Sequence, residues 1–172
     1  MIIPLMKPNE WEFLQSYLHK DQIMLEYGSG RSTAIISGHV QTLYSVEHDA
    51  KWHNKVSSDI KHLPNINYFH VPPNIIPKKE KLKPAKYEWF VDYINWPKTQ
   101  DTIFDVVLID GRARQWVAES ILDNIRDDSF VFIHDYGKNK RPRYDRVLEF
   151  YDVVASEHTM VLLKKKEEYV ST

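Results

Sequence analysis

The chain has 172 residues, of which 42% are hydrophobic and 27% are charged, and its formal net charge at pH 7 is −1. This length suits about one domain of roughly 150 residues, and the composition is globular rather than disordered or fibrous. The near-neutral charge argues against a dedicated duplex-binding protein, and the lack of cysteine excludes disulfides, a thiol nucleophile and Cys-ligated zinc. No apolar run approaches the roughly 18 residues of a membrane span, and the start of the chain lacks a signal-peptide pattern. We therefore expect a cytoplasmic protein with no membrane partner.

Predicted strands and helices alternate along the chain. Strands are predicted over residues 22–27, 41–47, 66–71, 104–109, 129–133, 151–157 and 159–165. Helices are predicted over residues 31–38, 50–62, 87–94, 117–125 and 143–151. This alternation predicts an α/β fold: a doubly wound, mostly parallel seven-stranded sheet with helices on both faces and a C-terminal antiparallel β-hairpin. Ligands of such sheets bind beyond the carboxyl ends of the strands, so the residues that directly follow each strand are the candidates for function.

A glycine-rich loop follows the first predicted strand. Residues 26–33 read Glu-Tyr-Gly-Ser-Gly-Arg-Ser-Thr, and Gly28 and Gly30 permit a tight turn and a close approach of the backbone to a ligand. The helix that follows offers free N–H groups, with Ser32 or Thr33 as its cap. The loop is not a Walker A motif because no Gly-Lys-Ser/Thr follows, and Thr33 occupies the third glycine position of a dinucleotide fingerprint. A plain glycine turn between a strand and a helix is the alternative.

The second predicted strand ends in an acid. Glu47 lies about 20 residues beyond the glycine loop, where a carboxylate can accept hydrogen bonds from both hydroxyls of a ribose. The alternative is that Glu47 or Asp49 caps the next helix. Asp49 suits that capping role better, which leaves Glu47 for a ligand.

These features together resemble the class I, Rossmann-like S-adenosylmethionine-dependent methyltransferases. The shared pattern is acid-x-Gly-x-Gly after the first strand, an acid at the end of the second strand and a closing hairpin. Glu26 separates the pattern from the nicotinamide fingerprint, in which that position is normally not acidic. The resemblance covers essentially the whole chain and implies a single Rossmann-like domain over residues 1–172, with an N-terminal helical segment over residues 1–20.

The resemblance implies S-adenosylmethionine as the cofactor. Residues 28–30 would line its methionine part, Glu26 would brace that loop and Glu47 would bind the ribose. The full cofactor-binding set implied in this way is Glu26, Tyr27, Gly28, Ser29, Gly30, Ser32, Thr33, Glu47 and His48. The family often has an acid or amide for the adenine after the third strand, where this sequence reads His-Val-Pro-Pro, so the adenine contacts stay unassigned.

Three polar residues follow the fourth and fifth predicted strands, and we expect them to converge near the transferable methyl group as catalytic residues: Asp110, His134 and Asp135. Methyl transfer is an in-line displacement that needs alignment, and a positioned base that takes the proton of the acceptor adds about 10²–10⁴-fold to the rate. Asp110 or His134 is the candidate base, and histidine has the better intrinsic pKa at neutral pH. The alternatives are that Asp110 caps the next helix and that His134 makes a structural hydrogen bond.

The sequence leaves room for a divalent metal ion but does not favour one. Asp110 and Asp135 occupy the strand ends from which catechol-type O-methyltransferases hold magnesium, but the asparagine that follows the second carboxylate in that family is Tyr136 here. Two carboxylates make a sparse site for a hard cation. The stretches 110–114 and 134–136 are also similar to those of small sugar- or polysaccharide-directed O-methyltransferases.

Basic residues gather in and beside two predicted loops, 73–85 and 136–143, which we expect on the acceptor side. These residues are Lys78, Lys79, Lys81, Lys83, Lys86, Lys138, Lys140, Arg141, Arg143 and Arg146. Arginines bind carboxylates or phosphates through paired hydrogen bonds, so an anionic acceptor is a hypothesis. The predicted acceptor-binding residues are Arg112, Arg114, Tyr136 and Arg143. A pair of solvated loops is the alternative.

The leading hypothesis is O-methylation of a small-molecule or carbohydrate acceptor. A non-catalytic cofactor-binding or partner module is one alternative, because one fold can host unrelated functions. An RNA or other nucleic-acid methyltransferase is another: the basic loops support it, whereas the near-neutral charge and the Asp-Gly-Arg at 110–112 oppose it. We expect acceptor choice to come from residues 1–20, from the two loops or from a second subunit, which leaves a homo-oligomer open.

Overall fold

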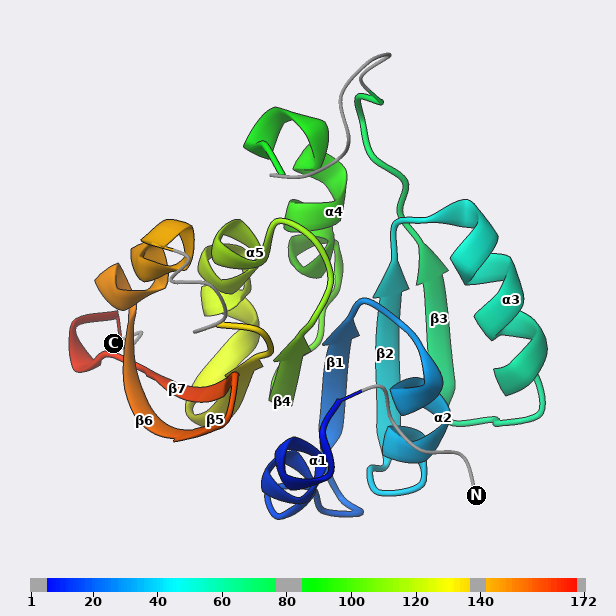
Figure 1. Ribbon diagram of the computed structural model, residues 1–172, viewed down its shortest axis with the longest axis horizontal. Coiled ribbons are helices and arrows are strands. Elements are labelled where there is room, and N and C mark those ends of the chain that lie inside the picture. Colours follow the sequence, from blue (N-terminus) through cyan, green and yellow to red (C-terminus); the bar gives the residue numbers. More distant parts are fainter. Residues whose placement is uncertain (1–5, 77–84, 137–141, 170–172) are drawn as a thin grey trace.

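The computed structural model describes residues 6–76, 85–136 and 142–169, and Figure 1 shows their arrangement. The strands are β1 Ile23–Tyr27, β2 Thr42–Glu47, β3 Ile66–His70, β4 Phe104–Ile109, β5 Ile125–Ile133, β6 Tyr151–Glu157 and β7 Met160–Lys165. They form one seven-stranded sheet in the order β3-β2-β1-β4-β5-β7-β6. β1 to β5 pair in parallel, whereas β7 is antiparallel to both β5 and β6. The predicted mostly parallel sheet with a closing hairpin is confirmed.

The helices that connect these strands are short. The α-helices are α1 Pro8–Gln15, α2 Arg31–Ser37, α3 Ala50–Ile60, α4 Val91–Asn95 and α5 Arg114–Ser120. The 3₁₀ helices are η1 Tyr87–Trp89, η2 Trp96–Thr99, η3 Ile121–Asn124, η4 Pro142–Glu149 and η5 Glu167–Tyr169. Within the described ranges, none of the helices has the length and apolar character that crossing a bilayer requires.

Several predicted elements differ from the structure. The helix predicted over 87–94 is split into η1 and α4 at Phe90, whose backbone leaves the helical region (φ −133°, ψ 27°). The helix predicted over 117–125 begins earlier, at Arg114, and its last turn tightens into η3, while the helix predicted over 143–151 is the 3₁₀ helix η4. β5 begins at Ile125, four residues before the predicted start at 129. The sequence pattern does not indicate this earlier start, because residues 126–128 are charged and exposed and interrupt the apolar run.

Successive residues of a strand point to opposite faces of the sheet, so each strand contributes side chains to both faces. Both faces are covered by buried hydrophobic clusters. On one face, Val107 belongs to a buried cluster that includes Tyr93 of α4 and residues of α5. On the other face, Val106 belongs to a second cluster with Leu14 of α1 and Ile36 of α2. The carboxyl ends of the strands are left as the edge at which polar side chains can gather.

A buried carboxylate ties β1 to its neighbours. Glu26 is fully buried and accepts hydrogen bonds from Ser32 Oγ (2.9 Å), Thr33 Oγ1 (2.7 Å) and Ser45 Oγ (2.7 Å). Thr33 Oγ1 in turn accepts the N–H of Gly30 at 2.9 Å. Burial raises the pKa of Glu26 to about 7, although the three hydroxyl donors act in the opposite direction. Glu26 therefore braces the glycine loop against α2 and β2.

Gly28 and Gly111, which follow the ends of β1 and β4, pack closely against each other. Gly28 has φ +88°, a left-handed conformation that favours glycine. A Cβ at Gly28 would lie 2.7 Å from both N and Cα of Gly111, and a Cβ at Gly111 would lie 2.1 Å from the hydroxyl of Tyr93. The loops after β1 and β4 can therefore approach each other only while both positions lack a side chain.

We predict that Gly28→Ala lowers the free energy of unfolding by about 2 kcal/mol or more, because a left-handed alanine is strained and its Cβ meets backbone atoms. Gly30→Ala is the matched control, since its Cβ would meet only the Ser32 hydroxyl, at 3.9 Å. Urea denaturation measures both variants. Equal stability of the two would contradict the role given to the glycine contact.

Glu26 makes stability depend on pH. Its pKa of about 7 in the folded chain exceeds the ordinary value of 4.5, so the folded state binds this proton more tightly than the unfolded state. The contribution of the protonated carboxyl is full below pH 4.5 and is lost as the pH rises through 7, by about 3 kcal/mol.

For Glu26→Gln we therefore predict a free energy of unfolding that lacks this fall between pH 4.5 and about 8. Denaturation curves recorded across that range measure the difference. Glu12→Gln, which alters an exposed glutamate of α1, serves as the control and should keep the wild-type slope. Parallel pH curves for wild type and Glu26→Gln would show that Glu26 is not the titrating group.

Candidate active site

A cavity of about 600 Å³ opens at the carboxyl ends of β1, β2 and β4. Its walls include Gly28 and Ser29 after β1, Glu47 and His48 at the end of β2, and Asp110 and Arg112 after β4. Lys51, Trp52 and Lys55 of α3 complete one side. Cavities of roughly 300–1,000 Å³ suit small ligands and cofactors. The structure thus gathers around one cavity the residues that the sequence places after three different strands.

Some of the predicted cofactor residues turn their side chains away from this cavity. The Tyr27 ring lies in the core cluster that includes α4, and its hydroxyl donates to the carbonyl of Tyr93 at 3.0 Å. The hydroxyls of Ser32 and Thr33 donate hydrogen bonds to Glu26. These three side chains therefore support the loop, and the cofactor-binding role predicted for the three residues stays a prediction.

Glu47 is a buried acid at the cavity wall, with an exposed fraction of 3%. Its carboxylate accepts the backbone N–H groups of Ser29 (3.1 Å), His48 (2.8 Å) and Asp49 (2.8 Å). Burial alone would raise the pKa of Glu47, but the hydrogen bonds from His48 and Asp49 hold it below its ordinary value. Asp49 itself caps α3 by accepting the N–H of Trp52 at 2.8 Å, as predicted. Glu47 is therefore left as an ionised acceptor at the cavity.

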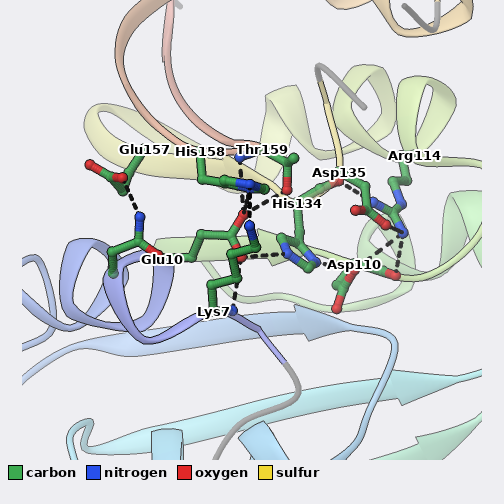
Figure 2. A network of polar contacts seen from close by, with 10 residues as sticks. Lys7, Glu10, Asp110, Arg114, His134, Asp135, Glu157, His158 and Thr159 are labelled. Carbon is green, nitrogen blue, oxygen red and sulfur yellow. Dashed lines mark hydrogen bonds and ion pairs between the residues drawn. The ribbon is translucent and has the colours of Figure 1, made fainter. Parts of the chain in front are cut away.

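Asp110, His134 and Asp135 come together at the ends of β4 and β5, as Figure 2 shows. His134 Nδ1 lies 2.9 Å from Asp110 Oδ1, and Arg114 Nη2 lies 3.2 Å from the same oxygen. Asp135 has a left-handed backbone (φ 56°) and its Oδ2 lies 3.8 Å from Arg114 Nη2. Of these three, Asp110 is the one on the cavity wall. It does not cap α5, whose N-cap is Ala113.

Arg114 holds the ends of β4 and β5 together. Its guanidinium is buried and donates to the carbonyl oxygens of Gly111 (3.0 Å) and Asp110 (2.9 Å) and to that of His134. Together with the ion pair to Asp110, these contacts engage most of the N–H donors of the guanidinium. Arg114 thus clamps the two loops, and because it also lines the cavity its role in binding an acceptor stays a prediction.

Arg112 contrasts with Arg114. It is half-buried in the cavity wall, and among the described residues no hydrogen bond or ion pair engages its guanidinium. Burial, together with the neighbouring charge of Arg114, lowers the pKa of Arg112. A desolvated cation of this kind gains from an anionic ligand, because charge-assisted hydrogen bonds are stronger than neutral ones.

The remaining acceptor predictions receive less support from the structure. Tyr136 is half-buried with its ring centroid 6.3 Å from that of Tyr144, and burial together with Asp145 raises its pKa. The side chain of Arg143 lies outside the described residues. So do most of the predicted loop 73–85 and its lysines at 78–83, and the basic residues at 138–141.

Glu10 of α1 belongs to the site, although the sequence analysis did not identify it. Its side chain is buried, with an exposed fraction of 1%, and its Oε2 lies 3.2 Å from His134 Nε2. Local sequence offers no signal for this, since Glu12 on the same helix is exposed. The contact arises from tertiary packing of α1 beside the end of β5.

The carboxylates of this cluster are neutralised by protein cations. Asp110, His134 and Asp135 each offer one atom within 4.8 Å of the others, a spacing that a metal ion could bridge. However, Arg114 lies against both carboxylates, and the ring nitrogen of His134 that faces Asp110 is already paired. The donor set therefore fits a salt-bridge network better than a metal centre, in agreement with the preference drawn from the sequence.

Comparison with solved structures identifies the fold. A methyltransferase-like protein from Silicibacter pomeroyi superposes with a TM-score of 0.77 at 24% identity, covering 95% of this chain and 88% of the other. An rRNA methylase from Streptococcus thermophilus matches with a TM-score of 0.63 at 14% identity, covering 96% and 100%. SMU.1697c, a methyltransferase candidate from Streptococcus mutans solved in complex with SAH, matches with a TM-score of 0.61 at 13% identity, covering 95% and 100%.

The sequence itself matches no protein-family model and no curated protein. The likeness to known proteins therefore rests on the fold of the chain, including its sheet order β3-β2-β1-β4-β5-β7-β6. On this evidence, the chain has the Rossmann-like fold of the class I S-adenosylmethionine-dependent methyltransferases.

Proposed function

We propose that this protein is an S-adenosylmethionine-dependent methyltransferase that methylates an oxygen of a small-molecule or carbohydrate acceptor. The observation that carries the proposal is the single cavity that joins the Gly28 loop, the ionised Glu47 and the Asp110 carboxylate. The fold shared with methyltransferases, one of them solved with SAH, supports the same cofactor.

The cofactor would lie along the ends of β1 and β2. Gly28 and Ser29 line the cavity next to Glu47, which suits a methionine part followed by a ribose. Glu47 accepts three backbone N–H groups and, at a longer 3.3 Å, the hydroxyl of Ser29, so a ribose hydroxyl would take the place of the Ser29 hydroxyl. The same backbone bonds hold its orientation before any ligand arrives.

When bound, the cofactor supplies an electrophilic methyl group on a sulfonium centre. Asp110 Oδ1 is held by His134 and Arg114, and because Asp110 lines the cavity its second oxygen would accept the hydrogen bond of an acceptor hydroxyl. Methyl transfer would join the acceptor oxygen to the methyl carbon and would leave the electron pair of the broken carbon–sulfur bond on sulfur. The hydroxyl proton passes to Asp110, so the methylated product leaves neutral at that oxygen.

Arg112 favours an acceptor that carries a negative group. It lies on the same wall as Asp110, so a carboxylate or phosphate bound at Arg112 would place a nearby hydroxyl toward Asp110. A uronate or a phosphorylated sugar has this combination.

RNA is the second candidate acceptor. One of the similar structures is an rRNA methylase, so the near-neutral charge of this chain does not set nucleic acid aside. Lys51 and Lys55 on the cavity wall would meet a phosphate backbone equally well.

We predict that S-adenosylhomocysteine binds in the micromolar range and that Glu47→Gln weakens it by about 10- to 100-fold, because a hydrogen bond to a charged group contributes roughly 1.5–3 kcal/mol. Asp59→Asn, which alters an exposed carboxylate of α3, is the control and should bind like wild type. Isothermal titration calorimetry measures all three proteins, with circular dichroism as the check on folding. Absence of binding to the folded wild type would refute the proposed cofactor.

Asp110→Asn should leave that affinity unchanged within a few-fold but slow methyl transfer by about 10²–10⁴-fold, because it removes the proton acceptor. The assay follows transfer from labelled cofactor to a panel of uronates, phosphorylated sugars, phenols and RNA, with and without chelator. We expect label in the anionic sugars and no effect of the chelator. Label in RNA alone would replace the carbohydrate proposal by the second candidate.

A further inference from the structure

Glu10 is a buried carboxylate that joins three distant parts of the chain, as Figure 2 shows. On the turn between β6 and β7, Thr159 donates to Oε1 from its backbone N–H (3.0 Å) and its hydroxyl (2.6 Å). His158 Nδ1 lies 3.2 Å from the same oxygen, and the backbone N–H of Lys7 donates to Oε2 at 3.0 Å. The fifth contact, from His134 Nε2 to Oε2 at 3.2 Å, reaches the candidate active site.

This carboxylate is ionised. Burial would raise the pKa of Glu10, but the hydrogen bonds from Thr159 and Lys7 lower it to about 2. The turn that supplies these bonds holds His158 in a left-handed conformation (φ 52°), which is uncommon for a residue other than glycine. At neutral pH Glu10 therefore places a negative charge beside His134 Nε2.

His134 is paired with a carboxylate on each side. Its Nδ1 faces Asp110 at 2.9 Å and its Nε2 faces Glu10 at 3.2 Å. A neutral imidazole has only one N–H donor, so two ionised partners require the imidazolium. Burial lowers the pKa of His134, but Asp110, Asp135 and Glu10 together raise it above its ordinary value.

This arrangement changes the role expected of His134. As an imidazolium with both nitrogens engaged, it has no free lone pair to take a proton from an acceptor, so of the two candidate bases we favour Asp110. Asp110 Oδ1 is instead fixed by two cations, His134 and Arg114. The orientation of Asp110 then depends on His134 staying protonated.

We infer that Glu10 is a positioning residue of the active site, which acts through the His134 imidazolium to hold the Asp110 carboxylate in place at the cavity. The inference rests on the proposed methyl transfer for its catalytic consequence. Its structural part, the control of His134 by Glu10, stands on the contacts in Figure 2. It also makes α1 and the β6–β7 turn part of the site, although neither lines the cavity.

The first test needs neither cofactor nor acceptor. NMR titration of the histidine rings, with His134 assigned from a His134→Gln variant, gives its pKa in wild type, Glu10→Gln and Glu12→Gln. We expect the pKa of His134 to fall by about one unit in Glu10→Gln, since an opposite charge within roughly 4–6 Å favours the charged form. Glu12 is exposed, and its variant should titrate like wild type. An unchanged His134 in a folded Glu10→Gln protein would overturn the inference.

The second test uses the methyl-transfer assay. Because His134 must be protonated, activity should decline as the pH rises through its pKa, and this alkaline limb should move by about one unit to lower pH in Glu10→Gln. The KM for the cofactor should stay within twofold, because Glu10 does not line the cavity. A lower kcat with an unmoved limb would show a merely structural role and overturn the inference.

Glu10→Asp keeps the charge but shortens the side chain, so it guards against misfolding of the glutamine variant. We expect its His134 pKa and alkaline limb to lie between those of wild type and Glu10→Gln, and a wild-type pKa with reduced kcat would count against the inference. The proposed function fails separately, if S-adenosylhomocysteine does not bind any of these folded proteins.

Discussion

Carboxylates buried at the carboxyl edge of the sheet control the geometry around them. A buried carboxylate is tolerated only where hydrogen-bond donors surround it, so each one gathers backbone and side chains to itself. Glu26 draws its donors from α2 and β2, and Glu47 draws them from the loops after β1 and β2. Glu10 draws them from the β6–β7 turn and the end of β5. The hydrogen bonds that satisfy these acids therefore connect the loops at the ends of the strands to the elements around them.

Glu26 is the last residue but one of β1 and Glu47 is the last residue of the neighbouring β2, yet their surroundings move their pKa values in opposite directions. Glu26 meets three neutral hydroxyls in full burial and feels the negative charge of Asp110, so its proton is retained near neutral pH. Glu47 meets backbone N–H groups and His48, which favour its ionised form. The first acid can therefore serve as a neutral brace, while the second keeps a charge for a ligand. The glycine-rich segment after β1 contacts both acids, because Ser29 donates to Glu47 and Ser32 donates to Glu26.

The sequence predicts best the features that depend on local chemistry or on topology. Asp49 as a helix cap follows from its place before α3, and the convergence of Asp110 with residues 134–135 follows from parallel strands ending at one edge. Glu10 could not be found in this way, because its partners lie more than a hundred residues away and its own helix contains an exposed glutamate as well. The clamp formed by Arg114 depends on carbonyl oxygens whose positions exist only after β4 and β5 have paired.

Two arginines separated by one residue show how burial and partners divide roles in the loop after β4. Arg114 donates to carbonyl oxygens and pairs with Asp110, so its positive charge is compensated within the protein. Arg112 has been desolvated with no hydrogen bond or ion pair to its guanidinium among the described residues; the charge of Glu47 offsets part of that cost, and an anionic ligand would offset more. Asp110 stands on the same cavity wall, so under the proposed function a ligand with a negative group and a hydroxyl would meet both residues at once.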